Sequence, residues 1–137
     1  MRYKKKHELS IVNYYQTSIG LRFVAPYEGL GNWSFYNAHF ISRYRERMKL
    51  DIEDPLEVAV TFFMRNEGFK NSHTEKRGNK LYSLASINDG IALGYKQKNI
   101  YTWNTFVAQS MLTKNQARID NKNVLARLAI NIKEAFD

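Results

Sequence analysis

Four residues between positions 39 and 47 combine proton-transfer groups with two guanidinium groups: His39, Glu46, Arg43 and Arg47. An α-helix turns about 100° per residue, so these side chains would share a strip along one side of a helix. Phe40 and Tyr44 fall on the adjoining arc, which is apolar. The strip therefore borders a buried face, where its side chains would be held beside a groove rather than surrounded by water.

This set of groups suits phosphodiester cleavage without a metal ion. A histidine or a glutamate can transfer a proton near neutral pH. Arginines can hold a phosphate through paired hydrogen bonds and stabilise the charge of a pentavalent transition state. The alternative is structural: Arg43 and Glu46 are spaced for an ordinary i,i+3 ion pair, and His39 could satisfy a hydrogen bond near the start of the helix.

Two helices are predicted around this segment. The first covers residues 38–50, with Asn37 as its N-cap. The second begins at Pro55, because Asp54 can cap it and Glu57 stands at the third helical position. Its predicted apolar stripe consists of Leu56, Ala59, Val60, Phe63 and Met64.

The predicted strands are residues 18–25, 33–36, 81–87, 91–96 and 100–107. Asp89-Gly90 is a typical hairpin turn and joins two of them. Residues 70–79 are polar and predict a loop. Residues 113–136 predict a C-terminal helix, because Thr113 can cap it and apolar residues follow at helical spacing.

This order predicts an α+β fold in which the helices pack on an antiparallel β-meander, with extra N-terminal strands and a C-terminal helix. Both central helices are expected on one face of the meander. The chain has 137 residues, two prolines and no linker-like stretch, so we expect a single domain over residues 1–137.

Charge favours a polyanionic partner such as RNA. The net charge is +8, and residues 1–50 hold nine Lys/Arg against three Asp/Glu. Concentrated positive charge attracts phosphates and gains from counterion release. Aromatic residues interleave with this basic region: Tyr14, Tyr15, Tyr27, Trp33, Phe35 and Tyr36. They could stack on bases, although aromatics more often belong to the core.

Cysteine is absent, which removes disulfides and thiolate ligands and favours a reducing, cytoplasmic location. His7 and His73 have no second ligand at metal spacing, so we expect neither a metal site nor a cofactor. The basic start is not followed by an apolar run, so we expect no secretory signal and no contact with a membrane.

The pattern His39-x3-Arg43-x2-Glu46-Arg47 resembles the H-x3-R-x2-E-R helix of uncharacterised families in the barnase–EndoU–colicin–RelE-like group of toxin-type ribonucleases. The resemblance covers residues 38–108 and extends loosely to Thr105. It implies that Arg43 and Arg47 bind the scissile phosphate and that His39 or Glu46 takes the proton from the ribose 2′-OH. Thr105 or a nearby tyrosine would orient the phosphate. The N-terminal strand region and the C-terminal helix depart from the small toxins of this group.

Three functions follow as hypotheses. The first is a metal-independent ribonuclease that yields a cyclic phosphate and a 5′-hydroxyl end. The second is a nucleic-acid-binding module without chemistry. The third is an interaction protein whose basic face meets an acidic partner, such as an antitoxin. The enzyme hypothesis requires its site residues to converge on one open cleft: His39, Arg43, Glu46, Arg47 and Thr105.

Overall fold

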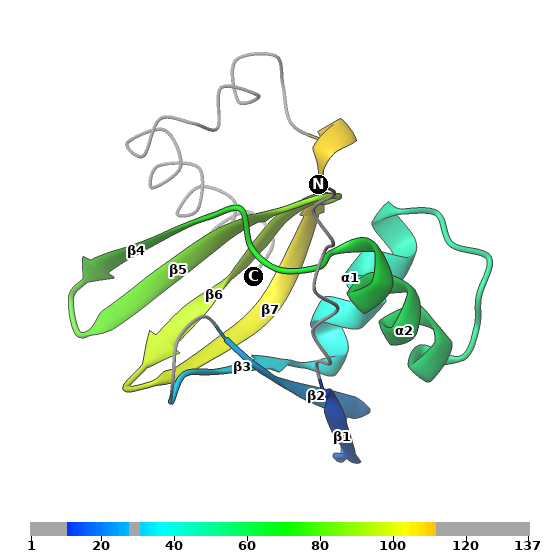
Figure 1. The fold of residues 1–137 in the computed structure, drawn as a ribbon, viewed down its shortest axis with the longest axis horizontal. Helices are drawn as coiled ribbons and strands as arrows, with labels where there is room; N and C mark the ends of the chain where they lie inside the picture. Colours follow the sequence, from blue (N-terminus) through cyan, green and yellow to red (C-terminus); the bar gives the residue numbers. More distant parts are fainter. Residues whose placement is uncertain (1–10, 28–30, 112–137) are drawn as a thin grey trace, which may run out of the picture.

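A computed structural model describes residues 11–27 and 31–111. In chain order, the elements are β1 (Asn13–Gln16), β2 (Leu21–Pro26), β3 (Trp33–Tyr36), α1 (Ala38–Arg47), α2 (Pro55–Arg65), β4 (Asn71–Arg77), β5 (Lys80–Ile87), β6 (Gly90–Gln97), β7 (Ile100–Ala108) and a 3-10 turn (Gln109–Met111). The strands of this described part form one seven-stranded sheet in the order β1-β2-β3-β7-β6-β5-β4 (Figure 1). The predicted C-terminal helix lies outside the described residues.

The sheet is mixed. The expected antiparallel meander is present as β5, β6 and β7, but it is only part of the sheet. After β3, the chain forms α1 and α2 and then the four consecutive strands β4, β5, β6 and β7. The last of these, β7, pairs with β3 in parallel. All other neighbouring strands in the described sheet pair antiparallel. The N-terminal strands therefore continue the meander into one larger sheet.

The segment predicted as a loop at residues 70–79 is largely strand β4, so that prediction was wrong. β4 is an edge strand that pairs only with β5, from Asn71 opposite Ser86 to Arg77 opposite Lys80. Its side chains are mostly exposed. An edge strand that needs no buried side chain has no apolar alternation, and the sequence pattern therefore resembled a loop.

The first helix begins where its cap predicts. The Asn37 side chain accepts a hydrogen bond from the Phe40 backbone N–H at 2.9 Å. The helix ends at Arg47, earlier than predicted, because Lys49 adopts a left-handed conformation with φ of 55°. A single left-handed residue breaks the i to i−4 ladder, and it turns the chain toward α2.

The second helix also begins at its predicted cap, where Asp54 accepts a hydrogen bond from the Leu56 backbone N–H at 3.0 Å. Its fully buried residues are Val58, Ala59 and Phe62, of which only Ala59 belongs to the predicted apolar stripe, while Leu56 and Phe63 of that stripe are partly buried against the core. Two members of the predicted stripe, Val60 and Met64, are 51% and 74% exposed. Residues 58–64 are apolar almost throughout, so the sequence did not determine which side of this helix is buried.

Both helices lie on one face of the sheet, which we call the helix face (Figure 1). They cover its centre rather than the meander alone, because α1 contacts β7 while α2 contacts α1 and β2. Aromatic rings form the contact. The Tyr44 ring lies 4.9 Å from both the Phe62 ring and the Phe106 ring, in edge-on geometry that favours aromatic pairs.

A bulge divides the side chains of β7 between the two faces. Leu93 pairs with Thr105 and Gly94 pairs with Trp103, which leaves Asn104 as an extra residue in β7. A Cβ atom at position 94 would overlap the carbonyl oxygen of Thr102, so the close approach at the bulge requires glycine. As a result, Trp103 and Phe106 both lie on the helix face although they are three positions apart.

The opposite face, which we call the far face, carries its own buried set on β5, β6 and β7: Leu84, Ile91, Leu93, Thr105 and Val107. None of these residues belongs to the core cluster that α1 and α2 complete.

Candidate functional site

The charged strip of α1 contains an ion pair. Arg43 Nη1 lies 3.1 Å from Glu46 Oε2, and their side chains are 31% and 62% exposed. His39 is half-buried in the first turn of the same helix. Arg43 and Glu46 therefore form the i,i+3 ion pair that the structural alternative to a catalytic role predicts.

Arg47 is anchored to the sheet. Its Nη1 donates a hydrogen bond of 2.6 Å to the carbonyl oxygen of Phe106 in β7. Desolvation lowers the pKa of Arg47, the neighbouring Arg43 charge lowers it further, and Glu46 opposes both effects. The charges of the two guanidinium groups therefore influence each other, and the Arg47 guanidinium fastens α1 to β7.

Thr105 does not join the α1 strip. Its neighbour Phe106 packs on the helix face against Phe40 and Tyr44. Successive strand residues point to opposite faces, so Thr105 lies on the far face, where it pairs with Leu93 and is 1% exposed. The structure thus places the four α1 residues on one helix but separates Thr105 from them by the sheet.

A polar cluster around Asp89 ties the helices to the hairpin between β5 and β6. The Tyr44 hydroxyl donates to Asp89 Oδ2 at 2.5 Å, and Arg65 Nε lies 3.2 Å from the same oxygen. Asn66 donates to this carboxylate at 3.2 Å and accepts from the Asp89 backbone N–H at 3.0 Å. Burial, and then the hydrogen bond to Asp89, raise the pKa of Tyr44. The polar groups of this cluster are paired with one another, so the cluster, which we call the polar lock, holds the helices against the β5–β6 hairpin.

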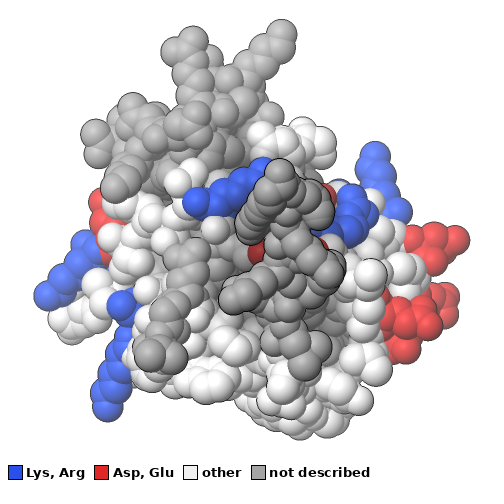
Figure 2. All heavy atoms as spheres, in the orientation of Figure 1, with Lys and Arg blue, Asp and Glu red and all other residues white. Residues whose placement is uncertain are grey.

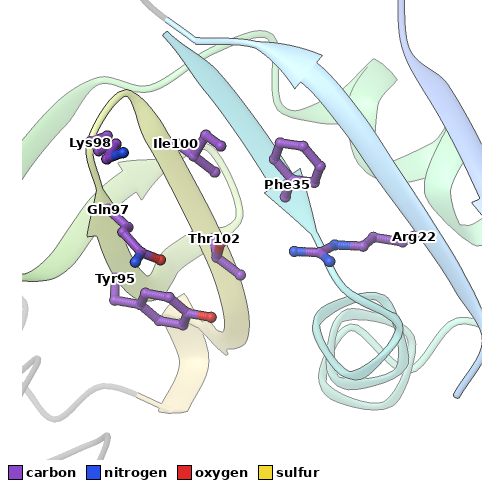
Figure 3. Close-up of a pocket in the computed structure, with 7 residues that line it drawn as sticks. All are labelled: Arg22, Phe35, Tyr95, Gln97, Lys98, Ile100 and Thr102. Carbon is purple, nitrogen blue, oxygen red and sulfur yellow. The ribbon is translucent and has the colours of Figure 1, made fainter. Parts of the chain in front are cut away.

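An open groove of about 430 Å³ crosses the far face of the sheet (Figure 3). Its lining residues come from β2, β3, β6, β7 and the turn between the last two: Arg22, Phe35, Tyr95, Gln97, Lys98, Ile100 and Thr102. The volume falls within the range of small-molecule sites.

The centre of the groove is one cross-strand row. Phe35 pairs with Thr102, and Thr102 pairs with Tyr95 on its other side. Neighbouring strands are about 4.8 Å apart, so two aromatic residues stand on strands separated by about 9.6 Å with a short threonine between them. Phe35 and Tyr95 therefore form two aromatic walls, and the short Thr102 side chain forms the floor between them.

Two cations frame this row. The Arg22 guanidinium lies 4.8 Å from the centre of the Phe35 ring, and its Nε is buried without a hydrogen-bond partner among the described residues. Lys98 is exposed in the β6–β7 turn with φ of 57°, a conformation uncommon for residues other than glycine. The described lining contains no acidic residue. The groove therefore presents positive charge and ring faces together.

Sequence reasoning missed most of this groove. Among the aromatic residues of the basic region, Phe35 is a base-stacking candidate, but no sequence pattern marks Arg22, Tyr95, Gln97 or Lys98 as site residues. A period-two pattern on both sides of the Lys98 turn could have placed Tyr95 beside Thr102. Nothing local could have placed Phe35 beside them, because that contact depends on the parallel pairing of β3 with β7.

Within residues 11–27 and 31–111, no cluster of three or more His, Cys, Asp or Glu side chains could hold a metal ion. In the same part of the chain, no helix is long and apolar enough to cross a membrane. Comparisons with protein-family models, curated proteins and solved structures gave no match.

Proposed function

We propose that this protein binds nucleic acid, with RNA as the first candidate, through the groove on the far face of its sheet. The observation that carries the proposal is the combination of two cations and two aromatic rings in one open groove whose described lining has no acidic residue. Phosphates are attracted by the cations and bases by the rings. This corresponds to a binding module without chemistry.

The distribution of charge supports this assignment. The chain carries a net charge of +8. Figure 2 shows acidic side chains gathered at the side of the molecule where α1 connects to α2. The exposed acidic residues of this connection and of the first turn of α2 are Asp51, Glu53, Asp54 and Glu57. Nucleic acid would be repelled from that side and attracted to basic surface elsewhere.

A metal-independent ribonuclease stays a prediction. Two arginines and a histidine on α1 favour it, but Thr105 lies on the far face and Arg47 is engaged with the main chain of β7. An acidic, antitoxin-like partner for a basic surface also stays a prediction, because positive charge alone does not separate it from RNA. A test for RNA cleavage in the presence of a strong chelator addresses the enzymatic hypothesis directly.

The binding test compares two lysines that share a backbone conformation. Lys98 and Lys49 are both exposed and left-handed, with φ of 57° and 55°, but only Lys98 lines the groove. Replacement by glycine removes one charge at either place and suits the left-handed backbone. We expect Lys98→Gly to weaken binding of a labelled RNA oligonucleotide and to reduce the slope of log Kd against log salt by about one. Lys49→Gly should leave both unchanged.

Fluorescence anisotropy at several salt concentrations measures both quantities. Equal effects of the two substitutions would mean that only net charge matters and that the groove is not the interface. Absence of salt-sensitive binding to any RNA or DNA oligonucleotide would overturn the proposed function itself.

A further inference from the structure

The groove has features that a phosphate-binding surface does not need. Tyr95 is 36% exposed although it is a large aromatic residue, and it stands across Thr102 from Phe35. A surface that only attracted phosphates would need cations, and exposed rings on its walls would add nothing to Coulomb attraction. The two walls therefore indicate contact with a planar group.

The spacing of the walls fits one planar ring. A flat ligand between two rings needs two contacts of about 3.5–4 Å each, or about 7–8 Å in total. The strands that carry Phe35 and Tyr95 are about 9.6 Å apart, which is wide enough to admit one planar ring between their side chains. On the Phe35 side, the Arg22 guanidinium lies 4.8 Å from the ring centre and forms one wall together with the ring. A guanidinium plane is itself a stacking surface for bases.

The groove also offers hydrogen-bond partners for the edge of a base and for the phosphate beside it. The Gln97 amide can donate and accept, and the Thr102 hydroxyl on the floor can do both. Lys98 stands in the turn at one end, and the buried Nε of Arg22 has no hydrogen-bond partner among the described residues. Neutral donors at the centre and cations around them match a nucleotide, with its neutral base and charged backbone.

From these features we infer that the groove holds one unpaired nucleobase between Tyr95 and the Phe35–Arg22 wall, so that the protein selects single-stranded over double-stranded nucleic acid. The inference rests on the proposed function and specifies its ligand. Bases in a duplex are stacked on one another and cannot enter a slot between two side chains. Bases in a single strand can turn outward and exchange stacking on their neighbours for stacking on Tyr95.

The experiment uses the full chain and a single-stranded RNA oligonucleotide with one central 2-aminopurine, whose fluorescence changes when its stacking changes. We expect binding to alter this fluorescence and Tyr95→Ala to weaken affinity by about 5- to 150-fold, which corresponds to the roughly 1–3 kcal/mol that a base gains by stacking on an aromatic side chain. Tyr14→Ala is the matched control. Tyr14 is also an exposed tyrosine, at 53%, but it pairs with the core residue Phe23 and so lies on the helix face.

A second variant fills the slot instead of removing a wall. Thr102→Phe places a ring on the floor of the open groove, while phenylalanine keeps the preference for strands. It should abolish the fluorescence change and leave the salt-dependent part of binding in place. Thermal unfolding checks each variant, and Tyr95→Leu replaces Tyr95→Ala if the alanine variant does not fold.

The same oligonucleotide annealed to its complement is the competitor. We expect the duplex to compete at least tenfold more weakly than the single strand. Equal competition, with a fluorescence signal that Tyr95→Ala and Thr102→Phe do not change, would overturn base insertion and leave electrostatic nucleic-acid binding intact. Failure of the wild-type protein to bind either form would overturn the proposed function and this inference together.

Discussion

At the scale of single residues, Tyr44 connects the apolar core to a polar lock. Its ring is fully buried between Phe62 and Phe106, as its place on the apolar side of α1 predicted. Its hydroxyl reaches Asp89 in the turn between β5 and β6. One side chain therefore fixes the position of the helix against the hairpin, and its two parts can be tested separately.

Tyr44→Phe removes only the hydroxyl. We expect the free energy of unfolding to fall by about 1–3 kcal/mol, because the Asp89 carboxylate loses a partner in a mostly buried place. Burial raises the pKa of Tyr44 above its usual value of 10.0. The unfolded chain therefore ionises first, and stability should fall as the pH rises above about 10. Urea titrations at several pH values measure the free energy of unfolding, and we expect it to fall less steeply with pH in Tyr44→Phe. An unchanged dependence on pH would show that ionisation of Tyr44 does not cause the loss of stability.

Arg43 and Arg47 are adjacent on the same strip but have different partners. Both arginines are half-buried, but Arg43 pairs with the exposed Glu46, whereas Arg47 donates to the main chain of β7. We expect Arg43→Ala to cost on the order of 1 kcal/mol or less. Arg47→Ala should cost more, about 1–3 kcal/mol. The thermal unfolding midpoints of the two variants would show which substitution costs more stability. A larger decrease in the midpoint for Arg43→Ala than for Arg47→Ala would contradict this prediction. If the chain cleaves RNA, Arg43→Ala should also remove that activity without unfolding the protein.

At the scale of elements, α2 shows that an apolar sequence does not determine which side of a helix is buried. Phe62 is 1% exposed and packs against rings of α1 and β3, whereas Val60 is 51% exposed. Phe62→Ala should therefore cost about 3–5 kcal/mol by leaving a cavity. Val60→Lys should change stability by no more than about 0.5 kcal/mol. Chemical denaturation measures both, and a severe loss for Val60→Lys would show that α2 is rotated in solution.

The strands differ in how far local pattern defines them. The strand-like runs on both sides of Asp89-Gly90 predicted the hairpin of β5 and β6, whose turn residues are Asn88 and Asp89. β4 was missed because it is a polar edge strand that gains its pairing from β5 rather than from burial. Predictability thus followed how much of each strand is buried.

At the scale of the whole molecule, the sheet separates two surfaces. The helix face carries the aromatic core, which holds α1 and α2 in place. The far face carries the groove near β3 and the buried apolar set on β5 to β7. The exposed acidic segment lies where α1 connects to α2 (Figure 2). A binding surface on the far face can therefore vary without disturbing the packing of the helices.

The sequence alone determined the features that depend on near neighbours. Asn37 and Asp54 cap helices where predicted, because a cap needs only the next two or three backbone N–H groups. The hairpin of β5 and β6 forms at the predicted place for the same local reason, although Gly90 pairs with Ile87 and the turn residues are Asn88 and Asp89. The α1 strip is likewise a consequence of helical spacing, and it holds for His39 and Arg47 whatever their function.

Only the tertiary structure decided which residues share a site. Strict alternation would place Thr105 on the same face as Trp103, and the bulge at Asn104 moves it to the far face. The parallel pairing of β3 with β7 brings Phe35 to Thr102 across 67 positions of chain. Such contacts depend on the competition among all strands for partners, which no short window of sequence records. The α1 strip could therefore be found from spacing, whereas the groove required the folded sheet.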